Sequence, residues 1–302
     1  MRVLILHNPS SGTGSRRALV DDSEQLLRAD GHQVIRMGPM DPAAQGEIAR
    51  AELVVLAGGD GTVHHALPAL ARSRAAMYHL PLGTENLFAR HFGMDRHAVT
   101  LRRAVANPTI AEIDLGEANS RLFALMVSAG PDAGVVHDLA STRHGPISHL
   151  TYLAPVMRQL SVRPAPLWIE ADGTTIVEDR PGWAVVANLP DYGGRANPAP
   201  RASATDGLLD VVFMPAASTW RALRWFLAGR WGTAERHPDR IAVRASRVRI
   251  ATSQGATAPV QVDGEPFIKL ADAPREGCSD VLDVVCRRNA LRVLLPRATT
   301  HA

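Results

Sequence analysis

Hydrophobic residues in the first third of the chain alternate between short continuous runs and stretches with helical spacing. The continuous runs predict buried strands at residues 3–6, 33–37, 53–57 and 78–82. The stretches between them predict helices at residues 16–28, 43–51 and 61–71, and in the first of these Leu19, Leu26 and Leu27 fall on one side. Strands that alternate with helices in this way are typical of an open, mainly parallel α/β sheet, which binds ligands at the carboxyl ends of its strands.

The pattern changes after residue 114 to short apolar strands separated by turns. Such strands are predicted at residues 122–128, 167–171, 182–188, 208–214, 247–251, 259–262 and 281–286, with a last strand at 291–295. This spacing is typical of an antiparallel sandwich, which one predicted helix at residues 218–231 interrupts. We therefore expect an α/β domain at residues 1–114, a β-rich antiparallel sandwich domain at 115–296 and a tail at 297–302.

The most informative loop follows the predicted strand 53–57 directly and reads Gly58-Gly59-Asp60-Gly61-Thr62. Three glycines let the backbone turn sharply and bring its N–H groups close to a phosphate, because no Cβ stands in the way. Asp60 places a carboxylate where a nucleotide and its metal would lie. The structural alternative is a tight strand-to-helix turn with an acidic cap. Four special residues in five, at the end of a strand, favour a polyphosphate site.

Two further loops follow predicted strands of the same domain. One precedes a helix that begins with Arg16 and Arg17, and it offers N–H and hydroxyl donors to phosphate from Asn8, Pro9, Ser10, Ser11 and Gly12. It lacks the Gly-Lys-[Ser/Thr] ending of a Walker A loop, and a capped helix start is its structural alternative. In the other loop, Thr84 and Asn86 have two open roles: they could fix the turn through bonds to the backbone, or reach a ribose or phosphate.

Carboxylates recur at turns of the second half. Asp132 follows the strand 122–128, Asp206 precedes the predicted strand 208–214 and Asp210 lies within it, and Asp263-Gly264-Glu265 follows strand 259–262. Asp-Gly is a common hairpin turn, and a lone Asp after a strand is commonly a helix cap. A buried carboxylate near Asp60 or Asp132 would instead serve as a base for a hydroxyl or as a ligand for Mg²⁺.

Composition is that of an ordinary globular protein, with 46% hydrophobic and 21% charged residues among 302. We see no signal peptide and no apolar run of the roughly 20 residues that a membrane span requires, so we expect membrane contact to be peripheral. Two cysteines, Cys278 and Cys286, suggest neither a disulfide framework nor a zinc site and predict a cytoplasmic protein. A net charge of +3 and a pI near 9.3 favour anionic partners weakly.

Six motifs occur together along almost the whole chain: Asn8-Pro9-x-Ser11-Gly12, Gly58-Gly59-Asp60-Gly61-Thr62, Pro81-x-Gly83-Thr84-x-Asn86-x-x-Ala89-Arg90, Ser128-x-Gly130-x-Asp132-Ala133, Asn188 to Asp210 with Tyr192-Gly193-Gly194 and Asp206-Gly207-x-Leu209, and Asp263-Gly264-Glu265. In this order they resemble the diacylglycerol kinase catalytic-domain family, which includes bacterial lipid kinases and sphingosine or ceramide kinases. The second motif alone is shared with the related NAD kinases and phosphofructokinases.

The resemblance implies a Rossmann-like, NAD kinase- and phosphofructokinase-like nucleotide domain and a β-rich domain, with ATP and the lipid hydroxyl meeting in a cleft between them. ATP would be held by residues 8–12, 58–62 and Thr84. Glu265 would accept the proton of the lipid hydroxyl, and Asp132 would be a second acidic residue there. Asp206, with the carbonyls of Ser203 and Leu208, would match a structural magnesium position. Catalytic Mg²⁺ would arrive with ATP.

Several residues depart from the family pattern. His64 and His65 stand where the family reads Asn-Glu, and Leu87 replaces an aspartate of the Gly-Asn-Asp motif. Leu125 replaces an asparagine, and Met37 or Gly38 stands where a threonine is usual. Adjacent helix residues point about 100° apart, so we interpret the two histidines as polar surface and not as metal ligands.

We expect an ATP- and Mg²⁺-dependent kinase for the hydroxyl of diacylglycerol, ceramide, a sphingoid base or a similar lipid alcohol, with a role in phospholipid metabolism. The alternatives are a degenerate nucleotide- or lipid-binding protein and an NAD kinase-like enzyme with a soluble substrate. The expected partner is a lipid substrate at a membrane surface, with no nucleic acid, and a homodimer is left open. The helix 218–231 holds three of the five tryptophans and could lie on an anionic lipid surface. Packing onto the domain is the favoured alternative, and exposed tryptophans would reverse that preference.

Overall fold

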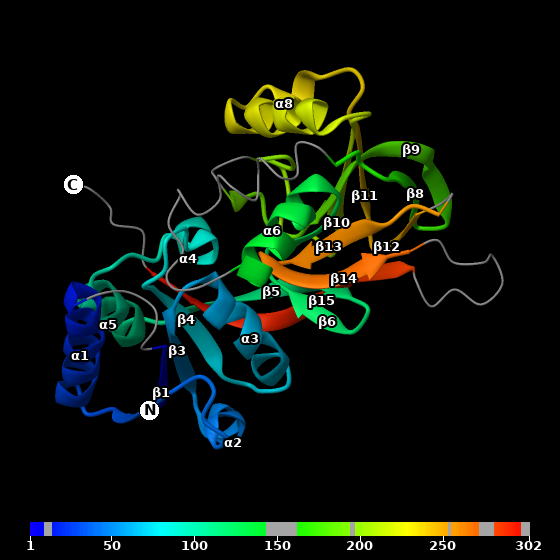
Figure 1. The fold of residues 1–302 in the computed structure, drawn as a ribbon. Helices are drawn as coiled ribbons and strands as arrows, with labels where there is room; N and C mark the ends of the chain where they lie inside the picture. The colour runs from blue at the N-terminus through cyan, green and yellow to red at the C-terminus, as the bar shows by residue number, and fades with distance from the viewer. Residues whose placement is uncertain (9–13, 143–161, 194–196, 253–254, 272–280, 297–302) are drawn as a thin grey trace. The chain divides into compact units, whose positions relative to one another are not determined.

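The computed structural model describes residues 1–8, 14–142, 162–193, 197–252, 255–271 and 281–296 (Figure 1). The chain divides into two compact units. The first contains Met1–Ile113 and the chain from Asn289 onward, and the second contains Asp114–Arg288. The sequence assigns residues 289–296 to the β-rich domain, whereas in the structure they belong to the first unit, because Val293 pairs in parallel with Met77 there.

The first unit is a parallel sheet with helices, as the sequence predicts. Its strands are β1 (Arg2–His7), β2 (Gln33–Met37), β3 (Leu53–Gly58) and β4 (Ala76–Pro81), in the order β4-β3-β1-β2, with the end of β15 (Leu282–Leu295) beside β4. Its helices are α1 (Gly14–Ala29), α2 (Ala44–Arg50), α3 (Asp60–Leu70), α4 (Leu87–His91) and α5 (Ala98–Ala106). Every residue of β3 is buried, as expected of an inner parallel strand that is covered on both faces.

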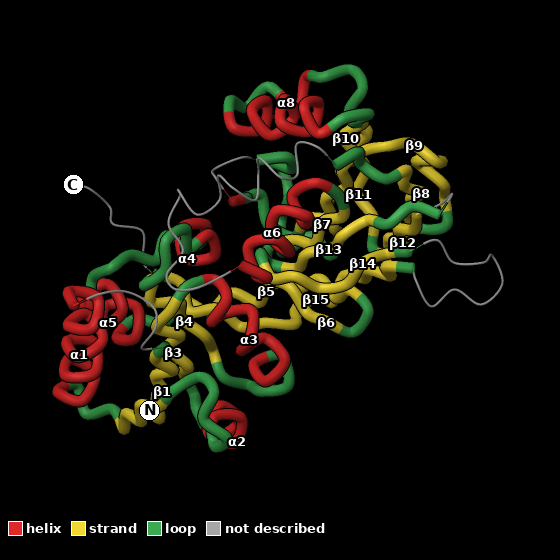
Figure 2. The backbone as a smooth tube through the Cα atoms, in the orientation of Figure 1, coloured by secondary structure: helices red, strands yellow, loops and turns green. Residues whose placement is uncertain are grey.

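The second unit consists mostly of strands (Figure 2), and they pair in antiparallel fashion. They are β5 (Thr109–Ala118), which begins in the first unit, β6 (Arg121–Phe123), β7 (Met126–Ala129), β8 (Pro166–Ala171), β9 (Thr174–Ala187), β10 (Leu209–Pro215), β11 (Ile241–Ala245), β12 (Arg247–Thr252), β13 (Ala258–Val262), β14 (Glu265–Leu270) and the start of β15. Its helices are α6 (Pro131–Thr142), α8 (Thr219–Arg230) and the short η3 (Ala234–Arg236).

The long strand β9 joins two layers of this unit. Its first part pairs with β8, which continues through β12 to β15, and its second part pairs with β7 and β10. Side chains from both sets of strands form one buried cluster, for example Ile169 and Ile250 from one set and Val186 and Val260 from the other. The β-rich character and the mainly antiparallel pairing that the sequence predicts are thus confirmed.

Two strand boundaries differ from the predictions. The run 122–128 forms two strands, β6 and β7, because the N–H groups of Ala124 and Leu125 turn to the carboxylate of Asp263 and leave the ladder. The runs 281–286 and 291–295 form one strand, β15, although Asn289 within it has φ 50°. Neither feature is visible in local hydrophobic periodicity, since each depends on a distant partner.

Candidate active site

The glycine-rich loop of the first unit is packed against a second loop of the same unit. A Cβ on Gly83 would lie 2.8 Å from the Cα of Gly59, and a Cβ on Gly59 would lie 3.3 Å from the Cα of Gly83. A Cβ on Gly58 would lie 2.1 Å from Oγ1 of Thr62, whose side chain is buried. These three glycines are therefore required by close loop packing, whether or not a phosphate binds.

Asp60 joins the same two loops through its carboxylate. Its Oδ2 accepts a hydrogen bond from the backbone N–H of Leu87 at 3.0 Å, and its Oδ1 accepts one from the N–H of Phe88 at 3.1 Å. Both oxygens thus satisfy unpaired N–H groups at the start of α4, although Asp60 itself is the first residue of α3. The carboxylate is a cross-loop cap, and the N–H groups of its own loop remain the candidates for phosphate.

Asn86 closes the second loop. It has φ 49°, its Oδ1 accepts from the N–H of Gly83 at 2.8 Å, and its Nδ2 donates to the carbonyl of Gly83 at 2.8 Å. This is the turn-fixing alternative that the sequence left open. Thr84 is exposed in the same turn, and the N–H of Asn8 donates to the carbonyl of Ala57. The other predicted nucleotide-binding residues of the first loop lie outside the described residues: Pro9, Ser10, Ser11 and Gly12.

Two arginines converge on the end of β4, and the sequence analysis did not identify this pair. Nη1 of Arg16 donates to the carbonyl of Leu82 at 2.6 Å. Nε and Nη2 of Arg96 donate to the carbonyls of Pro81 and Gly83 at 3.0 and 2.9 Å. Burial, and then the nearby charge of Arg16, lower the pKa of Arg96. The pair makes this end of the sheet electropositive, which suits the anionic phosphates of a nucleotide.

The departures from the family pattern have different surroundings. Leu87 is buried in the hydrophobic core, and its backbone N–H is one of the two that the Asp60 carboxylate accepts. His64 is buried and not on the surface, which corrects the sequence-based interpretation, whereas His65 is exposed. Their rings are 5.5 Å apart, and both side chains have partners. Among the residues that the structure describes, no group of three His, Cys, Asp or Glu side chains could hold a metal ion.

In the second unit, Asp132 lies in the first turn of α6 within a dense hydrogen-bond network. Its Oδ2 accepts from the hydroxyls of Ser128 and Tyr192, and from Nε2 of Gln261 at 3.5 Å. Its Oδ1 is buried and has no hydrogen-bond partner among the residues that the structure describes. Burial raises the pKa of the Asp132 carboxyl, and the bonds from Ser128 and Tyr192 lower it in part. Oδ1 is thus the one acceptor atom of this carboxylate that the network does not use.

Gln261 connects Asp132 to the turn that carries Glu265. Its Nε2 donates to Oγ of Ser128 at 2.8 Å, and its Oε1 accepts from the N–H of Gly264 at 2.7 Å. Gly264 directly precedes Glu265, the first residue of β14. The structure therefore places Asp132 and Glu265 in one unit, with Gln261 linking Asp132 to the turn that precedes Glu265. No local signal in the sequence indicates this role for Gln261, a lone glutamine in a strand.

Asp263 and Glu265 have different functions within that turn. Asp263 (φ 51°) and Gly264 (φ 83°) form the two-residue hairpin between β13 and β14 that Asp-Gly predicts. The Asp263 carboxylate accepts from the N–H groups of Ala124, Leu125 and Met126 at 2.9 to 3.1 Å. Glu265 is partly exposed, and no other described residue makes a hydrogen bond or ion pair to its carboxylate. Glu265 is thus free to accept a proton.

The predicted magnesium position was tested against the donors around Asp206. Its Oδ1 accepts from the N–H of Leu208 at 3.0 Å, and its Oδ2 pairs with Nη1 of Arg244 at 3.1 Å, while Oγ of Ser203 bonds to Thr205. A guanidinium already neutralises the one carboxylate, so this arrangement does not fit a tightly held Mg²⁺. The magnesium position is implied by the family resemblance alone.

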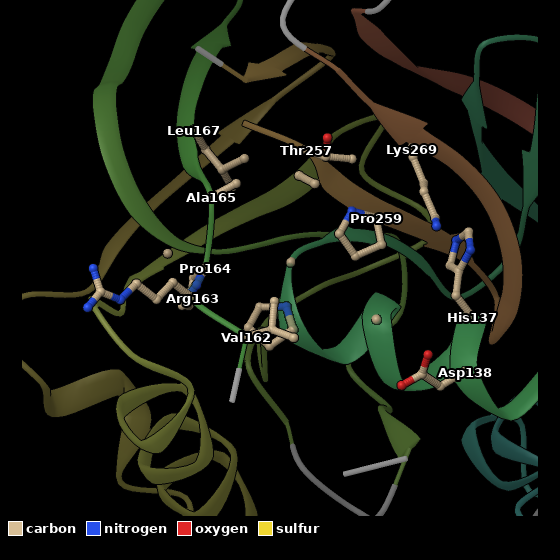
Figure 3. Close-up of a pocket in the computed structure, with 15 residues that line it drawn as sticks. His137, Asp138, Val162, Arg163, Pro164, Ala165, Leu167, Thr257, Pro259 and Lys269 are labelled. Carbon is tan, nitrogen blue, oxygen red and sulfur yellow. The ribbon is translucent and has the colours of Figure 1, made fainter. Parts of the chain in front are cut away.

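A cavity of about 170 Å³ adjoins the Asp132 network (Figure 3). It is lined by Gly130, Pro131 and Gly134 around the start of α6, and by apolar side chains that include Val162, Ala165 and Leu167. Figure 3 shows His137 of α6 and Lys269 of β14 extending toward each other at one side of it. The Nε2 of His137 also bonds to the carbonyl of Val260 at 2.8 Å. The cavity is thus largely apolar, with charged side chains such as Arg163 and Lys269 at its border.

Two family models together match almost the whole chain. A model of the diacylglycerol kinase catalytic domain matches residues 2–118, and one of the YegS C-terminal NAD kinase beta sandwich-like domain matches residues 125–294. The chain is 27% identical to a diacylglycerol kinase of Bacillus subtilis over 87% of this chain and 89% of that protein. It is 31% identical to a probable lipid kinase YegS-like of Pseudomonas putida over 71% and 70%. A diacylglycerol kinase structure from Bacillus anthracis shares the fold, with a TM-score of 0.71, 17% identity and coverage of 99% and 98%.

Proposed function

The chain belongs to the family of lipid kinases built on a diacylglycerol kinase catalytic domain, and from this premise we propose that it phosphorylates a lipid alcohol with MgATP. The proposed acceptor is diacylglycerol, ceramide, a sphingoid base or a similar lipid. The observation that carries the proposal is the carboxylate of Glu265, to which no described residue bonds, at a turn that Gln261 connects to Asp132. The family alone does not choose among these lipids.

In the proposed reaction the first unit binds the nucleotide. N–H groups of the loop 58–62 and the guanidinium groups of Arg16 and Arg96 supply donors for the phosphates. Mg²⁺ enters with ATP as part of the substrate, where it neutralises charge on the β- and γ-phosphates. Asp60 contributes indirectly, since its bonds to the N–H groups of Leu87 and Phe88 hold the two loops together.

The chemical step is an in-line displacement. The lipid hydroxyl oxygen forms a bond to the γ-phosphorus, the bond from that phosphorus to the β,γ-bridging oxygen breaks, and ADP leaves with the electron pair. Glu265 takes the hydroxyl proton and thereby becomes neutral. Oδ1 of Asp132, which has no partner, is the second acceptor that would orient the hydroxyl. The products are ADP and a lipid phosphate monoester.

The test uses the purified chain, labelled ATP and a panel of lipids with NAD as a soluble competitor. We expect transfer to one lipid class, and a loss of about 10²- to 10⁴-fold in kcat for Glu265→Gln. The exposed Glu178→Gln, on β9 of the same unit, is the matched control and should keep full activity. Because the carboxylate of Glu265 makes no hydrogen bond or ion pair with a described residue, the Glu265→Gln variant should keep the melting temperature of the parent.

Three results would contradict parts of the proposal. Equal activity of Glu265→Gln and the parent would remove Glu265 as the base. Transfer to NAD and to no lipid would point to the soluble-substrate alternative. Tight nucleotide binding by calorimetry without transfer to any lipid would indicate a binding protein, for which the buried Leu87 at a position that is acidic in the family is the motivating observation.

A further inference from the structure

Helix α8 of the second unit exposes two tryptophans on one stripe. Trp220 is 62% exposed and Trp231, the residue after the helix, is 70% exposed. With Arg224 and Leu227 they follow the spacing i, i+4, i+7 and i+11, so the four side chains fall within about 60° around the helix axis. The two indoles are thus about 16 Å apart along one line, at a rise of about 1.5 Å per residue.

The opposite side of α8 is fixed to its own unit. Trp225 is buried, its Nε1 donates to the carbonyl of Pro215 at 2.9 Å, and its ring lies 4.2 Å from that of His237. Ala222 is buried on the same side. Figure 1 shows α8 beyond the end of β10, at the rim of the second unit. Trp225 thus packs α8 onto the unit, whereas Trp220 and Trp231 remain exposed. This exposure favours the alternative that α8 lies on a lipid surface.

The exposed stripe carries uncompensated positive charge. Arg224 lies between the two tryptophans, and Arg221 and Arg230 flank the stripe; all three side chains are exposed. None of the three has a carboxylate within ion-pair distance in the described parts of the chain. A second copy of the same face would place arginine against arginine. A surface that accepts indole rings and is itself anionic matches this stripe.

We propose that α8 docks the protein on an anionic lipid bilayer, with Trp220 and Trp231 at the headgroup level and Arg221, Arg224 and Arg230 toward lipid phosphates. Tryptophan favours this interfacial depth because its ring is apolar and its N–H remains hydrated. The biological meaning rests on the proposed function, since a lipid kinase must reach substrate held in a bilayer. Membrane docking itself does not require phosphoryl transfer, so the two are tested separately.

The experiment measures co-sedimentation of the full chain with phosphatidylcholine vesicles, with and without phosphatidylglycerol. We expect binding to the anionic vesicles only, together with a blue shift of tryptophan emission. Trp220→Ala combined with Trp231→Ala should weaken binding by at least about tenfold and abolish the shift. Replacing the three arginines by glutamine should weaken it by about fivefold per arginine and remove its salt dependence.

Two control variants remove exposed apolar side chains or exposed arginines at positions outside α8. Met40→Ala with Val99→Ala takes exposed apolar side chains from the first unit, and Arg72→Gln with Arg103→Gln takes exposed arginines; neither pair should change vesicle binding. On a dispersed short-chain lipid, the tryptophan variant should keep the parent's turnover, whereas turnover on vesicles should fall with binding.

Two outcomes would overturn the inference. One is equal vesicle binding by the tryptophan variant and the parent. The other is a tryptophan-dependent dimer in sedimentation equilibrium without vesicle binding, which would make the stripe a contact between copies of the chain. Vesicle binding through α8 without any lipid phosphorylation would leave the docking inference standing and contradict only the proposed function.

Discussion

Asp60 in the first unit and Asp132 in the second both follow a glycine near the end of a strand, yet their carboxylates have different partners. Both oxygens of Asp60 accept backbone N–H groups at the start of α4. In Asp132 one oxygen accepts three side-chain donors and the other, buried, has none. The first carboxylate is fully used by the fold, and the second retains an acceptor that the fold does not use.

The difference shows how to distinguish an acidic residue that stabilises the fold from one that can take part in the reaction. Asp263 resembles Asp60 in its contacts, although it lies in the second unit, since three backbone N–H groups occupy it. Glu265, two residues later, resembles Asp132 in having acceptor capacity to spare. An acidic residue whose oxygens are all bonded to backbone is expected to affect stability when it is removed, and one with an unused oxygen is expected to affect turnover.

The largest effect that this comparison predicts is the loss of turnover in Asp132→Asn, by about 10²-fold or more in kcat. The stability of the Asp132→Asn variant should increase. Burial raises the pKa of Asp132, so ionisation of this group costs folding free energy above its folded-state pKa. The amide variant has no such cost and should melt at a higher temperature than the parent at pH 8.

The pH dependence provides the check on that assignment. The stability gain of Asp132→Asn should shrink as the pH falls from the folded-state pKa, and it should be lost below the ordinary value for aspartate, about 4, where the carboxyl is protonated in the folded and the unfolded parent. Thermal melts across this range measure it, with the exposed Asp239→Asn as control. A gain that does not change with pH would contradict the raised pKa, and a variant with normal kcat would remove Asp132 from the site.

Asp60→Ala should show the reverse profile, a large loss of stability. Two backbone N–H groups lose their acceptor, which costs about 1–3 kcal/mol and lowers the melting temperature by several degrees. Asp60→Asn, which keeps one oxygen acceptor, should lose less. At saturating MgATP, and at a temperature where the parent and Asp60→Ala are both folded, the loss of activity should be small compared with the loss of stability. If Asp60→Ala melts like the parent and loses turnover, the comparison fails.

Much of the fold follows from the sequence because local patterns determine it. Runs such as residues 53–57 are apolar throughout, and an inner parallel strand needs that pattern, so β3 and its neighbours were predicted closely. The short helix α4 and the break between β6 and β7 were not predicted. Their caps come from Asp60 and Asp263, which are 27 and 139 positions away in sequence from Leu87 and Ala124. Local periodicity contains no information on such pairs.

The candidate site was predictable to a similar extent. The motifs identified Asp132 and Glu265, and in the structure Gln261 bonds to Asp132 and to the N–H of Gly264, the residue before Glu265. The sequence could not separate the two uses of glycine at residues 58, 59 and 83, because loop packing and phosphate approach both require the absence of a Cβ. Gln261 and Arg96 carry no motif, and only the hydrogen bonds of the folded chain identify them.

A smaller effect is expected from Gln261→Leu, which removes the link between Asp132 and the Glu265 turn and keeps the side-chain volume similar. We expect kcat to fall about tenfold with little change in KM, since the residue positions catalytic groups and does not contact substrate. Loss of the Nε2 donor should raise the pKa of Asp132 further and move the acidic limb of the pH–rate profile to higher pH. Thr252→Val, another buried polar change in this unit, should leave the profile unmoved.

The smallest effect concerns Asp206, which the comparison groups with Asp60 because the fold uses its carboxylate. Arg244 neutralises it at 3.1 Å, so chelation of divalent cations should change the melting temperature of the parent by no more than about 1 °C. In Arg244→Gln the carboxylate loses its partner, and added Mg²⁺ should then raise the melting temperature by mass action. A fall of several degrees when the parent is treated with EDTA would show instead that Asp206, with the carbonyls of Ser203 and Leu208, holds the structural ion that the family resemblance implies. The parent and the Arg244→Gln variant together therefore decide whether a guanidinium or a metal neutralises this turn.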